Sequence, residues 1–246
     1  MHTSDAAMTS FDQPIGMPLG DWRPPPRPPR TSILGRYCQL EPLDAARHAL
    51  RLFDANQRDL SGAAWTYLAY GPFDTPEAYR AWIASDCAGD DPLFYAILDR
   101  DTDLAVGVAS YLRIMPASGS IEVGHINYSP LLQRTRSATE AIYLLMRRAF
   151  DIGYRRYEWK CDALNAPSRA AALRLGFTFE GVHRQATVYK GRNRDTAWYA
   201  IIDRDWPALR VALERWLDPA NFDPQGRQRV RLSDLTAASA QVLAVR

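Results

Sequence analysis

The sequence predicts an α/β fold in which a central twisted, mixed sheet of about six to seven strands carries helices on both faces. Three observations lead to this prediction. The second half alternates short runs rich in β-branched and aromatic residues with amphipathic runs, as in strand–helix–strand crossovers. Residues 93–128 contain three strand-like runs separated only by turns. The chain has 246 residues, 47% of them hydrophobic, which is enough to bury the core of one large domain.

Residues 1–30 are expected to lie outside this domain. Residues 1–20 show no hydrophobic periodicity, which predicts a flexible tail. Residues 23–30 read Arg-Pro-Pro-Pro-Arg-Pro-Pro-Arg and should be extended, because proline fixes φ and removes a backbone donor. The pattern fits recognition by a partner module. We favour an arm that lies on its own domain, because short Pro-rich matches are compositional signals.

In the first half of the domain, capping residues mark two helices. Asp44 begins a helical pattern that continues to about Arg58. Thr75, followed by Pro76, begins another helix that ends near Cys87. The segments around these helices are rich in β-branched and aromatic residues, and they predict strands over residues 33–43, 93–98, 104–114 and 120–128.

In the second half, Ser137 and Glu140 have the spacing of a capping box, which predicts a helix that starts at Ser137. Asn165 is expected to cap a short helix. The remaining expectations are strands over residues 157–161, 177–190 and 196–202 and a helix over residues 203–217. The domain should therefore cover residues 31–218, with a loosely organised extension over residues 219–246.

Composition excludes several classes of protein. The net charge is +2, from 30 basic and 28 acidic residues, without the basic excess that is typical of nucleic-acid binders. No apolar run approaches the ~20 residues that span a membrane, and the N-terminus lacks a secretion-signal pattern. The three cysteines have no zinc-ligand spacing and indicate reduced thiols. We expect a cytoplasmic protein without a metal, a nucleic-acid partner or a membrane partner.

Residues 130–140 are the segment most suited to ligand binding. They follow a predicted strand and open a helix, where backbone amides lack intrahelical partners and the helix dipole is positive. Arg134 and Arg136 add positive charge. This predicts a phosphate or pyrophosphate site, although every helix has such an end and most bind nothing.

A wider set of motifs surrounds this segment in the order Ile121-Glu-Val-Gly124, Gln133-x-x-Arg136-x-Ala138, Asn165-Ala-Pro-Ser168 and Leu175-Gly-Phe177. Over about residues 31–217 they resemble the GNAT superfamily of acyl-CoA-dependent N-acetyltransferases. The likeness is greatest to the bacterial RimJ/RimL-type branch, which acetylates ribosomal-protein N-termini. The resemblance implies splayed central strands, acetyl-CoA as co-substrate and direct transfer to a primary amine, either a protein N-terminus or a small molecule. Related proteins often form homodimers.

The resemblance also implies where coenzyme A binds. Amides of the turn between Gln133 and Ala138 would surround its pyrophosphate, although the family usually has Gly where this chain has Arg136. Main-chain groups of residues 125–128 would pair with the pantetheine arm, and an amide near Ile126 would face the thioester oxygen. The cofactor-binding candidates are Ile126, Asn127, Tyr128, Gln133, Arg134, Thr135, Arg136, Ser137, Ala138, Thr139, Asn165 and Ser168. For Asn165, the residue type is equally typical of a simple helix cap.

The reaction needs an acceptor for the amine proton and a donor for the departing thiolate. Many GNAT enzymes use a Tyr as the donor, but Ala172 stands there, and the resemblance gives this role to Ser168, whose alternative is a first-turn hydroxyl. The Glu base of the branch aligns with Thr187, which cannot be a base. Glu122 is the preferred base, because a carboxylate on a central strand is seldom buried without cause. His125 is the second candidate if a bulge brings it to the same side, and a water relay is the third.

Two other functions remain open at this point. Arg136, Ala172 and Thr187 depart from the family pattern and favour a CoA-binding protein without catalysis. The Pro-rich arm favours an interaction protein. For an enzyme, aromatic residues between 65 and 82 are expected mainly in the core, with some of them lining the acceptor pocket.

Overall fold

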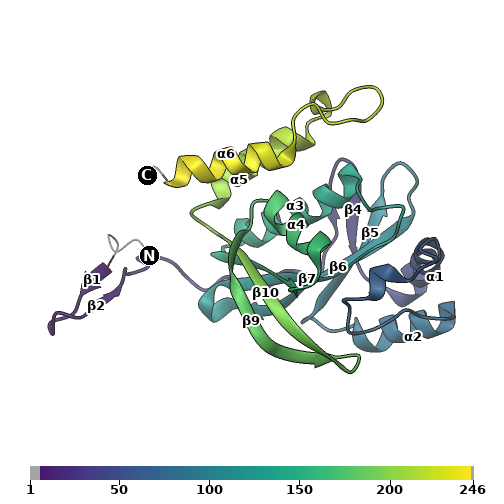
Figure 1. The fold of residues 1–246 in the computed structure, drawn as a ribbon, viewed down its shortest axis with the longest axis horizontal. Coiled ribbons are helices and arrows are strands. Elements are labelled where there is room, and N and C mark those ends of the chain that lie inside the picture. Colours follow the sequence, from purple (N-terminus) through teal and green to yellow (C-terminus); the bar gives the residue numbers. More distant parts are fainter. Residues whose placement is uncertain (1–5, 245–246) are drawn as a thin grey trace.

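The computed structural model describes residues 6–244, and its central feature is a mixed sheet with helices on both faces (Figure 1). The sheet has eight strands in the order β3-β4-β5-β6-β7-β8-β10-β9. The strands are β3 Ile33–Leu34, β4 Cys38–Pro42, β5 Leu93–Asp99, β6 Ala105–Met115, β7 Ser120–Tyr128, β8 Arg156–Asp162, β9 Thr178–Tyr189 and β10 Arg192–Ile202. Only the pair β7–β8 is parallel. The predicted mixed α/β architecture is confirmed.

Alternation along the strands sends apolar side chains to two cores. In β5, Tyr95 belongs to one cluster and its neighbours Phe94 and Ala96 belong to the other, because successive strand residues face opposite sides of a sheet. The helices are α1 Ala45–Asn56, α2 Pro76–Asp86, α3 Arg136–Asp151, α4 Ala166–Arg174 and α5 Trp206–Leu217. α1 and α2 cover one face, and α3 and α5 cover the other. No helix among residues 6–244 is long and apolar enough to cross a membrane.

The central strands separate partway along their length. β7 pairs with β8 only from Ser120 to Val123, opposite Arg156 to Trp159. Beyond this point β7 shifts its register on β6 between Gly124 and Asn127, and His125 takes a positive φ of 49°. This β-bulge bends β7 away from β8. The splayed strands that the sequence resemblance implied are therefore present.

The predicted strand over residues 33–43 is two strands, because Glu140 holds a turn between them. Its carboxylate accepts the backbone N–H groups of Arg36, Tyr37 and Cys38 at 2.8, 2.6 and 2.8 Å. A Cβ atom at Gly35 would lie 2.5 Å from Glu140 Oε2, so only glycine fits beside this carboxylate. Three amides without sheet partners thus bind one buried side chain.

The predicted capping box at Ser137 is wrong, because Glu140 binds the β3–β4 turn instead of the helix cap. Thr135 is the N-cap of α3, and its hydroxyl accepts the Ala138 N–H at 3.1 Å. Ser137 lies within the first turn, where its hydroxyl donates to the Tyr37 carbonyl at 3.2 Å. Glu140 faces the β3–β4 turn and makes no bond to the cap. A tertiary contact has displaced the local one.

The N-terminal segment is more ordered than predicted. Residues 6–16 form a two-stranded hairpin, β1 Ala6–Met8 and β2 Pro14–Gly16, that projects from the body (Figure 1); the part of the predicted tail before residue 6 lies outside the described residues. The Pro-rich segment lies along the domain, with Pro25 and Pro28 buried. Arg30 Nη2 donates to the Ala88 carbonyl at 2.9 Å and helps to hold it there.

The C-terminal segment contains a further helix, α6 Leu232–Ala244, where the sequence analysis expected loose organisation. Leu232 is buried, the Thr236 hydroxyl donates to the Arg174 carbonyl at 3.3 Å, and the Ser239 hydroxyl donates to the Ala208 carbonyl at 3.4 Å. These positions recur at helical spacing, so one face of α6 rests on α4 and α5. The mixed apolar and small hydroxyl character of that face hid the pattern.

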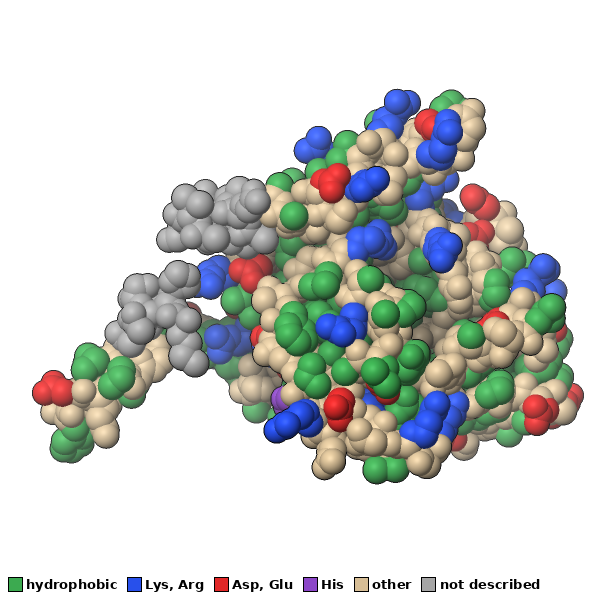
Figure 2. Space-filling model, viewed as in Figure 1, with side chains coloured by type: hydrophobic (Ala, Val, Ile, Leu, Met, Phe, Trp, Pro, Cys, Tyr) green, Lys and Arg blue, Asp and Glu red, His purple; other side chains and the backbone are tan. Residues whose placement is uncertain are grey.

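The β9–β10 hairpin is longer than predicted and reaches across the sheet. Its turn contains only Lys190 and Gly191, with φ of 48° and 69°, as in the two-residue turns that match strand twist. Lys190 Nζ donates to the Trp65 carbonyl at 2.9 Å, and Arg192 Nη2 donates to the Thr66 carbonyl at 2.8 Å. The tip of the hairpin is thereby fixed to the short 3-10 helix η2 Ala63–Trp65. Hydrophobic side chains gather over this hairpin on the face seen in Figure 2.

Candidate active site

A cavity of about 790 Å³ lies where β7 and β8 diverge. Its lining comes from β7 and β8, from the hairpin β9–β10, from the start of α4 and from the residues around η2. Predicted site residues in this lining are Glu122, His125, Ile126, Asn165 and Ser168. Tyr67 is the member of the predicted aromatic stretch that lines it, whereas Trp65, Tyr79 and Trp82 pack among themselves. No group of His, Cys, Asp and Glu within residues 6–244 is arranged to hold a metal.

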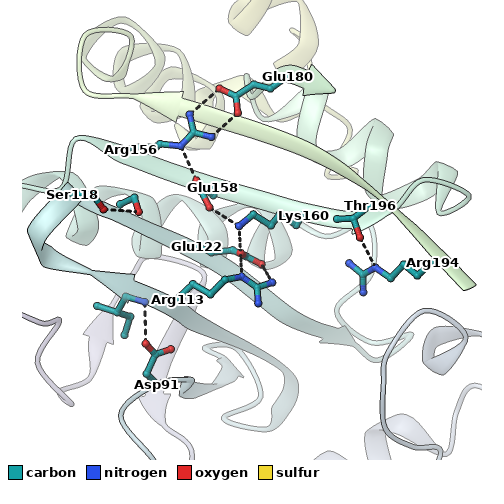
Figure 3. Close-up of polar contacts among 12 residues, drawn as sticks. Asp91, Arg113, Ser118, Glu122, Arg156, Glu158, Lys160, Glu180, Arg194 and Thr196 are labelled. Carbon is teal, nitrogen blue, oxygen red and sulfur yellow. Dashed lines mark hydrogen bonds and ion pairs between the residues drawn. The ribbon is translucent and has the colours of Figure 1, made fainter. Parts of the chain in front are cut away.

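A row of charges that alternate in sign starts in the cavity lining, with Arg113, Glu122 and Lys160, and continues beyond the cavity (Figure 3). In order they are Arg113, Glu122, Lys160, Glu158, Arg156 and Glu180. Lys160 is its centre, with Nζ 2.9 Å from Glu122 Oε2 and 2.7 Å from Glu158 Oε2 and a side chain that is 5% exposed. Burial alone would raise the pKa of Glu158, but Lys160 and Arg156 hold it below its usual value.

Glu122 is 3% exposed and both of its oxygens have partners. Oε2 accepts from Lys160 Nζ and, at 2.7 Å, from Arg113 Nε, and Oε1 accepts from Arg113 Nη2 at 3.2 Å. The carboxylate is therefore held in one orientation at the edge of the cavity. Two neighbouring cations compensate its charge.

His125 enters the same cavity because of the bulge. Its Nδ1 lies 3.3 Å from the Tyr70 hydroxyl, and its ring stacks on the Tyr70 ring at 5.6 Å. Burial, together with the charge of Arg113, lowers the pKa of His125 to about 4. The imidazole is therefore neutral at pH 7. The expected bulge and the shared cavity of Glu122 and His125 are both observed.

The start of α4 brings two predicted residues to the wall of the cavity. Asn165 is the N-cap of α4, and its Oδ1 accepts the Ser168 N–H at 3.1 Å. Trp159 Nε1 donates to Ser168 Oγ at 3.0 Å. This bond uses an acceptor lone pair, so the hydroxyl of Ser168 remains a donor, and in this structure it lies within hydrogen-bonding reach of the Cys161 thiol.

Comparison with known proteins shows which family has this architecture. Residues 39–178 match the profile of the family described as acetyltransferase (GNAT) domain. The chain is 44% identical to a GCN5-related N-acetyltransferase from Brucella melitensis, over 89% of this chain and 100% of that one, with a TM-score of 0.87. The chain belongs to the GNAT acetyltransferase family. It is therefore an acetyltransferase, and acetyl-CoA is the acetyl donor of its family.

Other relatives agree with this assignment. A probable GNAT-family acetyltransferase from Chromobacterium violaceum is 45% identical over 80% of this chain and 98% of that one, with a TM-score of 0.75. The microcin C7 self-immunity acetyltransferase MccE, solved in complex with acetyl-CoA and AMP, shares the fold at 24% identity and a TM-score of 0.60, over 68% of this chain and 93% of that one. No curated protein matches the chain.

The predicted pyrophosphate-binding turn of this GNAT domain lies outside the cavity, at the start of α3. The amides of Arg134, Arg136 and Ser137 have no hydrogen-bond partner among residues 6–244. The positive φ of the turn, 63°, falls on Arg134, whereas Arg136 is helical. Glycine's freedom is therefore not needed at position 136. The Arg136 guanidinium lies 4.7 Å from the ring centre of Tyr37 and 4.8 Å from that of Phe222.

Three further cofactor candidates of this GNAT domain, Gln133, Tyr128 and Thr139, have structural partners. Gln133 Nε2 donates to the Tyr128 carbonyl at 2.8 Å, and the Tyr128 hydroxyl donates to the Ala138 carbonyl at 3.2 Å. Thr139 Oγ1 accepts from Arg174 Nη2 at 2.8 Å. Asn127 is 3% exposed, and neither polar atom of its amide has a partner within residues 6–244. Ile126 alone of the 126–128 segment lines the cavity.

Five charged residues of the cavity were missed from the sequence: Arg113, Lys160, Asp162, Arg184 and Arg194. Lys160 and Asp162 lie on β8, whose alternation turns both toward the cavity, and Arg194 reaches it from β10. The signal for Asp162 was a carboxylate at the end of a predicted strand. No local signal marks Lys160 or Arg194, because their surroundings depend on strand pairing.

Proposed function

We propose that this GNAT protein binds acetyl-CoA in the gap between β7 and β8 and transfers its acetyl group directly to a primary amine in the cavity. The observation that carries the proposal is the end of the β7–β8 ladder at Val123 and Trp159. Beyond it, strand edges face a gap without a ladder partner. An extended ligand with amide groups, such as the pantetheine arm, can bind there as an added strand.

The rest of the donor fits the same end of the domain. The unpartnered amides at the start of α3 follow β7 directly, so they suit a pyrophosphate near the end of the gap. Arg136 is held between Tyr37 and Phe222, on the side of β4, so its side chain leaves these amides accessible. The amide near Ile126, in the bulge, would face the thioester oxygen as its negative charge develops.

The transfer requires one new bond and one broken bond. The neutral amine nitrogen attacks the thioester carbon, the carbon–sulfur bond breaks, and the coenzyme A thiolate leaves. Glu122 takes the amine proton, directly or through water, and later releases it to solvent, and Ser168 donates its hydroxyl proton to the thiolate and is reprotonated from solvent. The ring of His125 stacks on the Tyr70 ring and its Nδ1 lies 3.3 Å from the Tyr70 hydroxyl, so we assign His125 to orienting Tyr70. Burial raises the pKa of the Cys161 thiol, which supports direct transfer without an acyl-cysteine.

The acceptor is a primary amine on a protein N-terminus or on a small molecule. The motifs shared with RimJ/RimL-type enzymes support both kinds of acceptor and a cytoplasmic, bacterial setting. Aromatic and charged residues around η2 and the hairpin line the space in which the amine would bind.

Calorimetry and a thiol-release assay test this proposal. Acetyl-CoA and desulfo-CoA should both bind with micromolar affinity, and thiol should appear only when an amine pool is added with acetyl-CoA. Glu122→Gln should lower kcat about 100-fold without changing acetyl-CoA affinity. Glu77→Gln, at an exposed position on α2, is the matched control. Absence of acetyl-CoA binding would overturn the proposal, and binding without release from any amine pool would indicate a CoA-binding protein without catalysis.

A further inference from the structure

Asp162 and Arg194 are opposite charges that line the same cavity without pairing with each other. Thr196 is directly opposite Asp162 in the β8–β10 register, and Arg194 Nε donates to Thr196 Oγ1 at 3.2 Å. Both charged residues line the cavity. Within residues 6–244 no ion pair joins them. Each is held in place by neutral groups.

Asp162 is 4% exposed, and its side chain has only neutral hydrogen-bond donors within residues 6–244. Oδ1 accepts the Leu164 N–H at 2.8 Å, and Oδ2 accepts the Tyr189 hydroxyl at 2.8 Å. Burial and the Asp162 charge raise the pKa of Tyr189, so the phenol remains a donor at neutral pH. A buried carboxylate without a cation partner is a favourable site for an ammonium group.

Arg194 presents the complementary charge. It is half-buried, and only its Nε has a hydrogen-bond partner in the described part of the chain. Its guanidinium carbon lies 5.8 Å from the centre of the Tyr189 ring, whose hydroxyl binds Asp162. Figure 3 shows this side chain directed from β10 toward the space beside the Glu122–Lys160 pair. Two parallel N–H groups on a guanidinium match the two oxygens of a carboxylate.

The other cavity charges do not change this balance. Arg113 and Lys160 are paired with Glu122 and Glu158. Arg184, on β9, also lines the cavity, but it is exposed and its charge acts on Asp195. An acceptor with only an amino group would leave Arg194 uncompensated, and one with only a carboxylate would leave Asp162 uncompensated.

We propose, resting on the function proposed above, that the acceptor is a small amine with a carboxylate next to its amino group, that is, an α-amino acid. Arg194 binds the carboxylate, and Asp162 holds the ammonium group until it releases one proton to water; Glu122 takes the second proton during the transfer. The two protein charges line one cavity and are connected through Thr196 and Tyr189, so one small molecule that carries both an ammonium group and a carboxylate suits them. In a peptide the same carboxyl group is an uncharged amide, which cannot satisfy Arg194 in this way.

The test compares three matched acceptors for each amino acid that the wild-type enzyme acetylates. These are the acid, its carboxamide and the amine without the carboxyl group. With wild-type protein, kcat/KM should be at least about tenfold higher for the acid. Arg194→Gln should abolish this preference. It should raise KM for the acid and leave kcat/KM for the carboxamide unchanged. Arg51→Gln, at an exposed position on α1, is the matched control and should keep the preference.

Two further readouts separate the inference from the proposed function. Saturation-transfer NMR measures binding of amino acids in the presence of desulfo-CoA, independently of turnover, and Asp162→Asn should weaken that binding. If acetyl-CoA binds but carboxamides or N-terminal peptides are acetylated as well as the free acids, the inference is wrong while the function stands. The inference also fails if Arg194→Gln lowers kcat/KM for acid and carboxamide equally. If acetyl-CoA does not bind, the proposed function fails, and the NMR measurement still decides whether the cavity takes an amino acid.

Discussion

The Lys160 ammonium lies 2.9 Å from the Glu122 carboxylate and 3.6 Å from the centre of the Trp198 ring, in the floor of the active-site cavity. A second carboxylate, Glu158, lies 2.7 Å from the same nitrogen. One buried cation therefore fixes two carboxylates on neighbouring strands. This arrangement connects the stability of the sheet to the position of the proposed base.

Replacing Lys160 should destabilise the protein strongly. Lys160→Met leaves Glu122 and Glu158 buried with fewer cation partners, so we expect a loss of about 3–5 kcal/mol in the free energy of unfolding, measured in urea. Lys190→Met removes the other lysine of the chain, which is exposed, and should cost less than about 1 kcal/mol. Adding Glu122→Gln to Lys160→Met should recover part of the loss. Equal costs for the two lysines would contradict this account.

Glu140 should contribute more to stability than a capping residue would. Glu140→Ala leaves three backbone amides without their acceptor, so we expect a loss of about 3 kcal/mol or more. Glu77→Ala, at an exposed first-turn position of α2, should cost less than about 1 kcal/mol. A Glu140→Ala cost within the range of the Glu77 control would show that the β3–β4 turn holds without the carboxylate.

The neutral His125 predicts a pH dependence of stability. Its folded pKa, about 4, is below the unfolded value of 6.5, so the unfolded chain binds more protons between these values. The contribution of His125 to the free energy of unfolding is complete above pH 6.5. It is lost as the pH falls toward 4, by about 3 kcal/mol in total. Urea unfolding at pH 7 and pH 5 should show a smaller difference for His125→Gln than for the wild type. An unchanged difference would mean that other groups cause the loss.

Ser168 should affect the chemical step more than the binding of the donor. In Ser168→Ala the thiolate loses its proposed proton donor, so kcat should fall about 100-fold while calorimetric affinity for acetyl-CoA changes little. Ser168→Thr retains the hydroxyl and should keep much of the rate. If both variants lose the same activity, the hydroxyl contributes through the Trp159 bond and the packing of α4 rather than as an acid.

Local patterns in the sequence were sufficient for most elements and for part of the site. Asp44, Thr75 and Asn165 cap the predicted helices, because each cap depends on atoms within three residues of itself. Glu122, His125, Ile126, Asn165 and Ser168 meet in one cavity, because the motifs that pointed to them reflect the order of strands and helices in the family fold. Their catalytic and binding roles remain predictions.

Other features could not be read from local patterns. The cap at Thr135 instead of Ser137 depends on Glu140 binding a turn about a hundred residues earlier in the chain. The helix α6 was missed because its apolar face is defined by α4 and α5 rather than by a hydrophobic stripe of its own. Lys160, Asp162 and Arg194 enter the cavity through the pairing of β8 with β10.

The amino-acid sequence by itself determined the order of the elements, most of their caps and the motifs that place the chain among GNAT acetyltransferases, because these follow from interactions between residues close in the chain. Tertiary structure alone decided which charges meet across the sheet. Asp162 and Arg194 came to line one cavity through strand register, and Lys160 came between Glu122 and Glu158 through the parallel pairing of β7 and β8. Contacts between distant residues depend on register and burial, and no local pattern encodes these.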